Sequence, residues 1–89
     1  MNEISRHIGD KIRMYRKVRG MTLKQLADII HKSRATVSKY ETGEITLDVE
    51  TLFEISQALH VNLNQLTDYQ PPLALPEPLL PGVTRKSPF

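Results

Sequence analysis

Residues 22–43 read TLKQLADIIHKSRATVSKYETG and contain two helix-start signals close together. Thr22 and Gln25 have capping-box spacing, in which the hydroxyl accepts from a first-turn amide and the glutamine bonds back to the cap. The apolar pattern of this helix then breaks, and Ser33 is a favourable N-cap for a second helix. Thr42-Gly43 ends the second helix. The stretch therefore predicts two short helices joined by a tight turn.

Apolar residues at helical spacing predict three further helices, one before this pair and two after it. The first runs from about Ile4 to Arg19, and the other two are capped by Asp48 and Asn62. The residues expected on their apolar faces are Ile4, Ile8, Ile12, Met14, Tyr15, Val18, Val49, Leu52, Phe53, Ile55, Ala58, Leu59, Leu63 and Leu66. Strand-type alternation is absent over any useful length. The predicted fold is therefore all-α, a compact five-helix domain over residues 1–69 with one modest core.

The last twenty residues have a different composition. All six prolines lie from Pro71 onward, and the stretch PPLALPEPLLPG does not sustain a helix. It favours extended, polyproline-like backbone. We expect residues 70–89 to be a proline-rich tail or linker, in which Pro78–Pro81 also fits the PxxP pattern of an adaptor ligand.

Charge is divided unevenly along the chain, although the net charge is only +2. Residues 1–43 contain ten Lys or Arg against four Asp or Glu, whereas residues 44–89 contain two against six. A uniformly solvated surface does not usually sort charge in this way. The division predicts a basic face for a polyanion.

Composition excludes several classes of site. The chain has no cysteine, so it has no disulfide, thiol nucleophile or cysteine-based zinc site. His7, His31 and His60 are scattered without metal-ligand spacing, and no nucleophile–base pair is evident. We therefore expect no catalytic residue, no metal and no cofactor. Because no apolar run is long enough for a membrane span or a signal peptide, we expect a soluble, cytoplasmic protein without membrane contact.

The residue types on the helix pair suit DNA binding. A second helix can enter the major groove of DNA while the first crosses the backbone. Val37 and Tyr40 supply its inward side. Its outward side contains small, polar or basic residues and no bulky apolar one; these are Ser33, Arg34, Ala35, Ser38 and Lys39.

The segment LADIIHKSRATVSKYETG, residues 26–43, also resembles a known family. It is similar to the Cro/C1-type helix-turn-helix of lambda-repressor-like regulators, the XRE family. On either side, IGDKIRMYRKVRGMTLKQLA and LDVETLFEISQALHVNLNQL resemble the family's other helices, so that the likeness covers about residues 4–68. Two departures stand at His31 and His60, where relatives commonly have glycine and where the backbone would be left-handed.

The resemblance implies roles for individual residues. It places Arg34, Ala35, Ser38 and Lys39 at base edges, and Arg34 suits a bidentate contact to guanine. It places Thr22, Leu23 and Gln25 at a phosphate clamp, with Arg13, Ser33, Thr36 and Thr42 as further phosphate contacts. Arg16 and Glu41 match an internal ion pair that ties the first helix to the recognition helix, although a phosphate role for Arg16 competes.

These features predict sequence-specific binding of double-stranded DNA by a transcriptional regulator that is not an enzyme. By family habit, we expect a repressor that binds a roughly palindromic operator as a homodimer. One alternative is an antitoxin-type or other protein-interaction module that uses the tail. A further possibility is a C-terminal sensor or oligomerisation domain beyond this chain.

Overall fold

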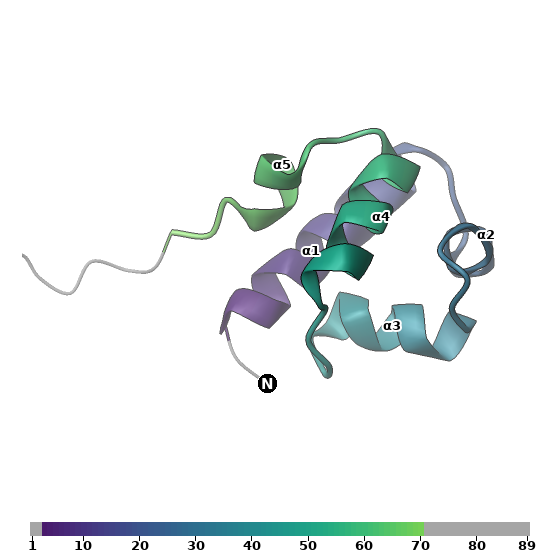
Figure 1. Cartoon of the computed structure of the whole chain (residues 1–89), viewed down its shortest axis with the longest axis horizontal. Coiled ribbons are helices and arrows are strands. Elements are labelled where there is room, and N and C mark those ends of the chain that lie inside the picture. Colours follow the sequence, from purple (N-terminus) through teal and green to yellow (C-terminus); the bar gives the residue numbers. More distant parts are fainter. Residues whose placement is uncertain (1–2, 71–89) are drawn as a thin grey trace, which may run out of the picture.

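Five helices arranged around one core make up the structure (Figure 1). The computed structural model describes residues 3–70, and all regular secondary structure in this range is helical. The helices are α1 (Glu3–Val18), α2 (Leu23–Ile29), α3 (Arg34–Thr42), α4 (Val49–Leu59) and α5 (Leu63–Thr67). The all-α, five-helix prediction is confirmed. The predicted proline-rich tail and its PxxP segment lie outside the described residues, apart from Gln70.

Side-chain caps fix where four of the helices begin. Thr22, Ser33, Asp48 and Asn62 each have extended backbone and accept a hydrogen bond from the amide three residues later. Thr22 and Asn62 complete capping boxes, in which a glutamine side chain bonds back to the cap amide. Helices of five and seven residues are too short to be stable alone, so caps and packing must hold α2 and α5 in place.

Left-handed backbone reverses the chain at four points. Gly20 and Gly43 have φ values of +72° and +82°, and His31 and His60 have +60° and +59°. His31 follows α2 and His60 is the C-cap of α4, as the comparison with glycine in relatives predicted. A non-glycine residue in this region costs about 1–2 kcal/mol, so both histidines carry local strain that the surrounding packing must offset.

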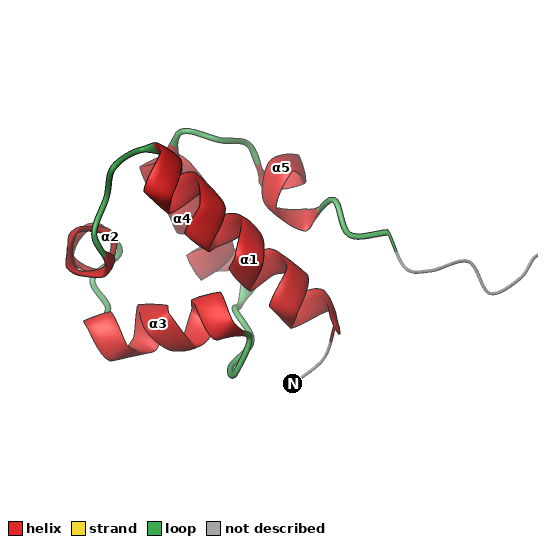
Figure 2. Ribbon diagram, turned by 180° about the vertical axis from the view of Figure 1, so that it is seen from behind, coloured by secondary structure: helices red, strands yellow, loops and turns green. Residues whose placement is uncertain are grey.

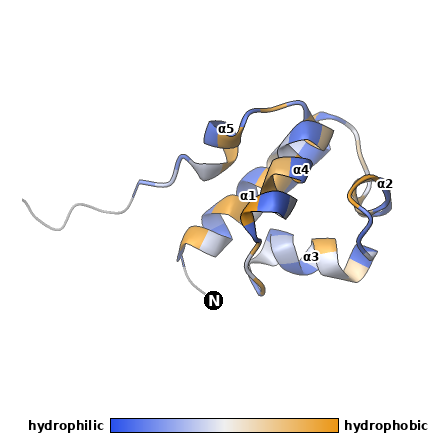
Figure 3. Ribbon diagram, viewed as in Figure 1, coloured by the Kyte–Doolittle hydropathy of each residue, from blue (hydrophilic) through white to orange (hydrophobic). Residues whose placement is uncertain are grey.

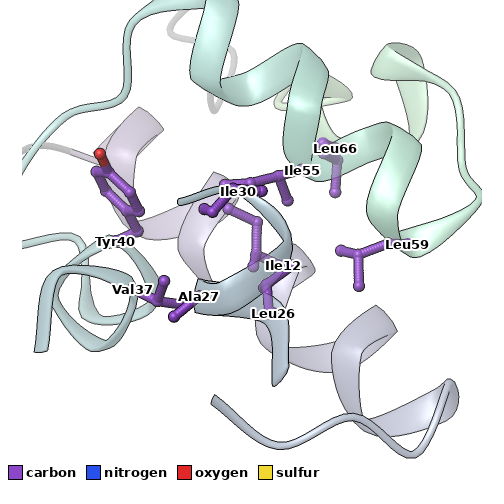
Figure 4. Close-up of a cluster of buried hydrophobic side chains, with 9 residues drawn as sticks. All are labelled: Ile12, Leu26, Ala27, Ile30, Val37, Tyr40, Ile55, Leu59 and Leu66. Atoms are coloured by element: carbon purple, nitrogen blue, oxygen red, sulfur yellow. The ribbon is translucent and has the colours of Figure 1, made fainter. Parts of the chain in front are cut away.

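Nine buried apolar side chains form the core, and every helix contributes at least one. Figure 4 shows them gathered between the helices. They are Ile12, Leu26, Ala27, Ile30, Val37, Tyr40, Ile55, Leu59 and Leu66. Tyr40 is 5% exposed, which is the core position predicted for it.

The predicted apolar faces of α1 and α4 were wrong in part. Ile4, Met14 and Val18 are 53%, 43% and 67% exposed, and Val49 and Phe53 are 76% and 50% exposed. The residues buried in their place are mostly small, polar or charged: Ser5, Gly9 and Arg16 on α1, and Thr51 and Ser56 on α4. Close backbone approach and buried polar pairing, rather than side-chain hydrophobicity, select these faces.

Gly9 explains how closely α1 approaches α3. A Cβ atom at this position would overlap the carbonyl groups of Tyr40 and Glu41, in the last turn of α3. Only glycine allows this approach without a shift of one helix. The contact fixes α3 against α1, and Figure 2 shows α3 lying across the lower end of the molecule with α2 beside it.

Candidate nucleic-acid interface

Helix α3 has one buried and one exposed face. Val37 and Tyr40 pack into the core, whereas Arg34, Ala35 and Lys39 are exposed and Ser38 is half-buried. Figure 3 shows the α3 ribbon as hydrophilic or nearly neutral apart from one hydrophobic band. The four residues predicted to read bases therefore share the outward side of the helix. This face is rigidly supported and presents no large apolar group.

The polar residues predicted at phosphates are partly used in local structure. Ser33 Oγ accepts from the Thr36 amide at 3.0 Å and lies 2.9 Å from Thr36 Oγ1. Thr42 Oγ1 donates to the Lys39 carbonyl at 3.2 Å. Gln25 Oε1 accepts from the Thr22 amide at 2.8 Å, which leaves the side-chain NH2 group of Gln25 as the part able to reach a phosphate. Leu23 is half-buried, so only its backbone amide suits that role.

A buried ion pair joins α1 to the end of α3. Arg16 Nε donates to Glu41 Oε2 at 2.6 Å and Arg16 Nη2 to Glu41 Oε1 at 3.1 Å. The two side chains are 10% and 5% exposed. Arg16 Nη1 also donates to the Met21 carbonyl at 2.8 Å, which ties the same guanidinium to the chain just before α2. Arg16 is thus held inside the structure, and a phosphate contact from it is not compatible with this geometry.

Several basic residues of the first half are bonded to other groups of the folded domain. The Arg19 guanidinium donates to the carbonyls of Leu59 and His60 at 2.7 and 3.1 Å, so it satisfies the end of α4. Lys24 pairs with Asp28 at 3.2 Å. The basic surplus read from the sequence therefore overstates the charge available to a polyanion. Sequence reasoning missed the role of Arg19 because its partners lie forty residues away.

The start of α1 is joined to the residues after α5. His7 Nε2 and Lys11 Nζ lie 2.7 and 3.4 Å from the Asp68 carboxylate, and the Tyr69 hydroxyl donates to Glu3. The hydrogen bond from His7, reinforced by Lys11, lowers the pKa of Asp68. The hydrogen bond to the Glu3 carboxylate raises the pKa of Tyr69. Asp68 of the second half thus offsets part of the positive charge of the first half.

Several exposed basic residues on α1 and α3 stay available. Within residues 3–70, no ion pair or side-chain hydrogen bond engages Arg13, Arg34 or Lys39. Arg6, to which the sequence gave no role, lies directly against Gly43 at the end of α3. In the same range, no group of three or more His, Asp or Glu side chains is placed to hold a metal ion. The helices described there are also too short or too polar to cross a membrane.

Two archaeal proteins have sequences similar to this chain. Each is named "Putative HTH-type transcriptional regulatory protein". The protein from Methanobrevibacter smithii is 36% identical over 55 residues, and the one from Methanothermobacter thermautotrophicus is 33% identical over 60. These matches cover 62% and 67% of this chain, but only 18% and 19% of the two relatives.

Solved structures share the fold. The clp gene regulator ClgR from Corynebacterium glutamicum superposes with a TM-score of 0.71 and 25% identity, over 73% of this chain and 69% of that one. The restriction-modification controller protein C.AhdI from Aeromonas hydrophila gives 0.67 and 21%, over 70% and 94%. Hydroxypropylphosphonic acid epoxidase from S. wedmorenis gives 0.71 and 24%, over 75% of this chain but 36% of the enzyme.

The sequence pattern of one protein family spans most of the folded part of the chain. The family described as helix-turn-helix, HTH_3, matches residues 12–66. This range includes the second part of α1, all of α2, α3 and α4, and most of α5. With its five-helix fold and the exposed outer face of α3, the chain belongs to the HTH_3 helix-turn-helix family, the XRE type of DNA-binding transcriptional regulators.

Proposed function

We propose that the protein binds double-stranded DNA sequence-specifically, with α3 in the major groove. The observation that carries the proposal is the two-sidedness of α3: Val37 and Tyr40 anchor it, while Arg34, Ala35, Ser38 and Lys39 face outward. Arg34 suits a bidentate contact to guanine O6 and N7, worth about 1–3 kcal/mol of discrimination. Ala35 offers only a methyl group, which suits a thymine.

Phosphate contacts would hold this helix in register. The exposed guanidinium of Arg13 on α1 and the amides at the start of α2 and α3 are the groups we assign to them. The hydroxyl groups of Ser33, Thr36 and Thr42 are already held by local hydrogen bonds. In this proposal the same hydroxyl groups also contact phosphates, from positions that the local bonds fix. Phosphate contacts release counterions, so affinity should fall steeply with salt.

The regulator acts, in this proposal, as a homodimeric repressor on a roughly palindromic operator. One such helix pair contacts about half a turn of DNA, and two-fold pairing places half-sites about one turn apart. ClgR and C.AhdI, whose folds are similar, are named as a gene regulator and a controller protein. The epoxidase neighbour shows that the fold also occurs within an enzyme chain, so fold alone does not carry the assignment.

Selection from a pool of random double-stranded DNA tests the proposal. The expected result is one enriched motif with two inverted half-sites whose centres are about 10 base pairs apart. Light scattering of the purified complex should give two chains per DNA duplex. An enriched single half-site bound by one chain would remove the dimer from the proposal. Recovery of the unselected pool, at any salt concentration, would refute specific DNA binding.

A further inference from the structure

A surface groove lies between α2 and α4, apart from every residue assigned to DNA. Its volume is about 440 Å³, and it is lined by Ile29, His31, Phe53, Glu54, Gln57 and Ala58. Ile29 and Phe53 are 48% and 50% exposed, and they place two large apolar side chains on the same groove. The left-handed turn at His31 forms one wall. We call this surface the α2/α4 groove.

Acidic residues border the groove. Glu54 lines it, and Glu50 is exposed one turn earlier on α4. Glu50 and Glu54 take part in no ion pair within residues 3–70. The surface therefore combines apolar anchors with uncompensated negative charge, which suits a segment with apolar and basic side chains.

The chain itself contains such a segment. Residues 79–86 read LLPGVTRK and contain three large apolar residues followed by Arg85 and Lys86. These two are the only Lys or Arg residues after Lys39. We propose that residues 79–86 dock in the α2/α4 groove of the same chain, with leucines against Ile29 and Phe53 and the basic pair near Glu50 and Glu54.

The linker before the segment sets its reach. The eight residues between Gln70 and Leu79 span up to about 30 Å when extended. Tethering raises the local concentration of the segment to about 1 mM. A groove that binds the free segment with a Kd of only about 1 mM would then be occupied about half of the time.

A second copy of the domain fits the groove less well. A two-fold contact through Phe53 would bring Glu50 and Glu54 of both copies together, and like charges oppose such pairing. The groove and its occupant are also independent of the DNA face, since none of the lining residues belongs to the proposed contacts. The docking proposal and the proposed function can therefore fail separately.

Paramagnetic broadening in the full chain tests the docking. Because the sequence has no cysteine, Ser87→Cys gives a single site for a nitroxide label. The expected result is selective loss of the amide signals of Ile29, Phe53 and Ala58, while signals of Arg13 and Lys17 on α1 persist. Reversing the basic pair, Arg85→Glu with Lys86→Glu, should restore the lost signals. When Glu50→Lys and Glu54→Lys are added to the Arg85→Glu, Lys86→Glu variant, the groove signals should be broadened again.

Mixed samples separate the possible occupants. Chains that carry the nitroxide but no nitrogen-15 are mixed with nitrogen-15-labelled chains that carry no nitroxide. Only the second kind of chain gives signals, so any broadening must come from contacts between molecules. The proposal expects no groove broadening in this mixture. Groove broadening there would show that the segment of a second copy binds and would overturn docking within one chain. Broadening spread evenly over the surface, or unchanged by charge reversal, would also overturn it.

Discussion

Removal of the Glu41 carboxylate should destabilise the whole domain. In Glu41→Ala, the Arg16 guanidinium stays buried but loses both hydrogen bonds to the carboxylate. Breaking a buried ion pair by removing one partner costs about 3–5 kcal/mol. The bond from Arg16 to the Met21 carbonyl remains, so the loss should lie near the lower end, at about 3 kcal/mol.

This loss is large against the total stability of so small a domain. At about 0.05–0.15 kcal/mol per residue, a folded unit of this size has a free energy of unfolding of about 3–10 kcal/mol. A loss of about 3 kcal/mol lowers Tm by about 12–24 °C. The measurement is urea and thermal unfolding of the full chain, followed by far-ultraviolet circular dichroism.

Two controls isolate the buried pair. Asp28→Ala breaks the exposed pair with Lys24, whose side chains are 72% and 66% exposed, and should cost no more than about 0.5 kcal/mol. The double variant Arg16→Met with Glu41→Leu replaces the buried pair by apolar side chains and should recover most of the stability. The reasoning is refuted if Glu41→Ala loses less than about 1 kcal/mol, or if the double variant is as unstable as the single one.

Other consequences can be measured independently. Gly9→Ala should lower the free energy of unfolding by about 1–3 kcal/mol, because the new Cβ meets the end of α3; a higher Tm, as an ordinary helical site would give, argues against that contact. Arg34→Ala should weaken DNA binding and relax preference at one base position, whereas Arg13→Ala should weaken all sequences equally and reduce the salt dependence; selection profiles that show the reverse would exchange the two roles. Asp68→Asn should cost stability at neutral pH. The pKa of Asp68 is lowered on folding, so its contribution is present above the unfolded pKa and disappears as the pH falls through the folded value. Urea unfolding of both forms should therefore converge in acid, once the pH lies below the folded pKa of Asp68, and a difference that persists there would contradict the titration.

Local signals in the sequence predicted the ends of the helices well. A cap such as Ser33 acts on an amide three residues away, so its effect can be read from the neighbouring sequence. The left-handed turns at His31 and His60 were instead predicted from the resemblance, because relatives commonly have glycine at these two positions. The fold class follows from these short-range features combined with the apolar spacing.

Long-range contacts could not be read from the sequence. Met14 and Val18 look like core residues by hydrophobicity, but the close crossing at Gly9 turns α1 so that Arg16 points inward. Arg19 looks like a DNA contact by charge, yet it caps α4. In both cases the deciding partner lies far along the chain, where spacing rules give no information. The outward residues of α3 were predicted because their inward neighbours, such as Val37, already define the orientation of the helix.

The contacts of Glu3 with Tyr69 and of His7 with Asp68 bring the first and last residues of the folded domain together. Domains whose ends are adjacent commonly tolerate circular permutation. A short linker from Gln70 to Glu3 would close the unit into a ring, and new ends could be opened in the exposed loop at residues 44–46. In such a permutant, neither end of the chain would lie next to α1 and α5. The chain would still run without a break through α2 and α3.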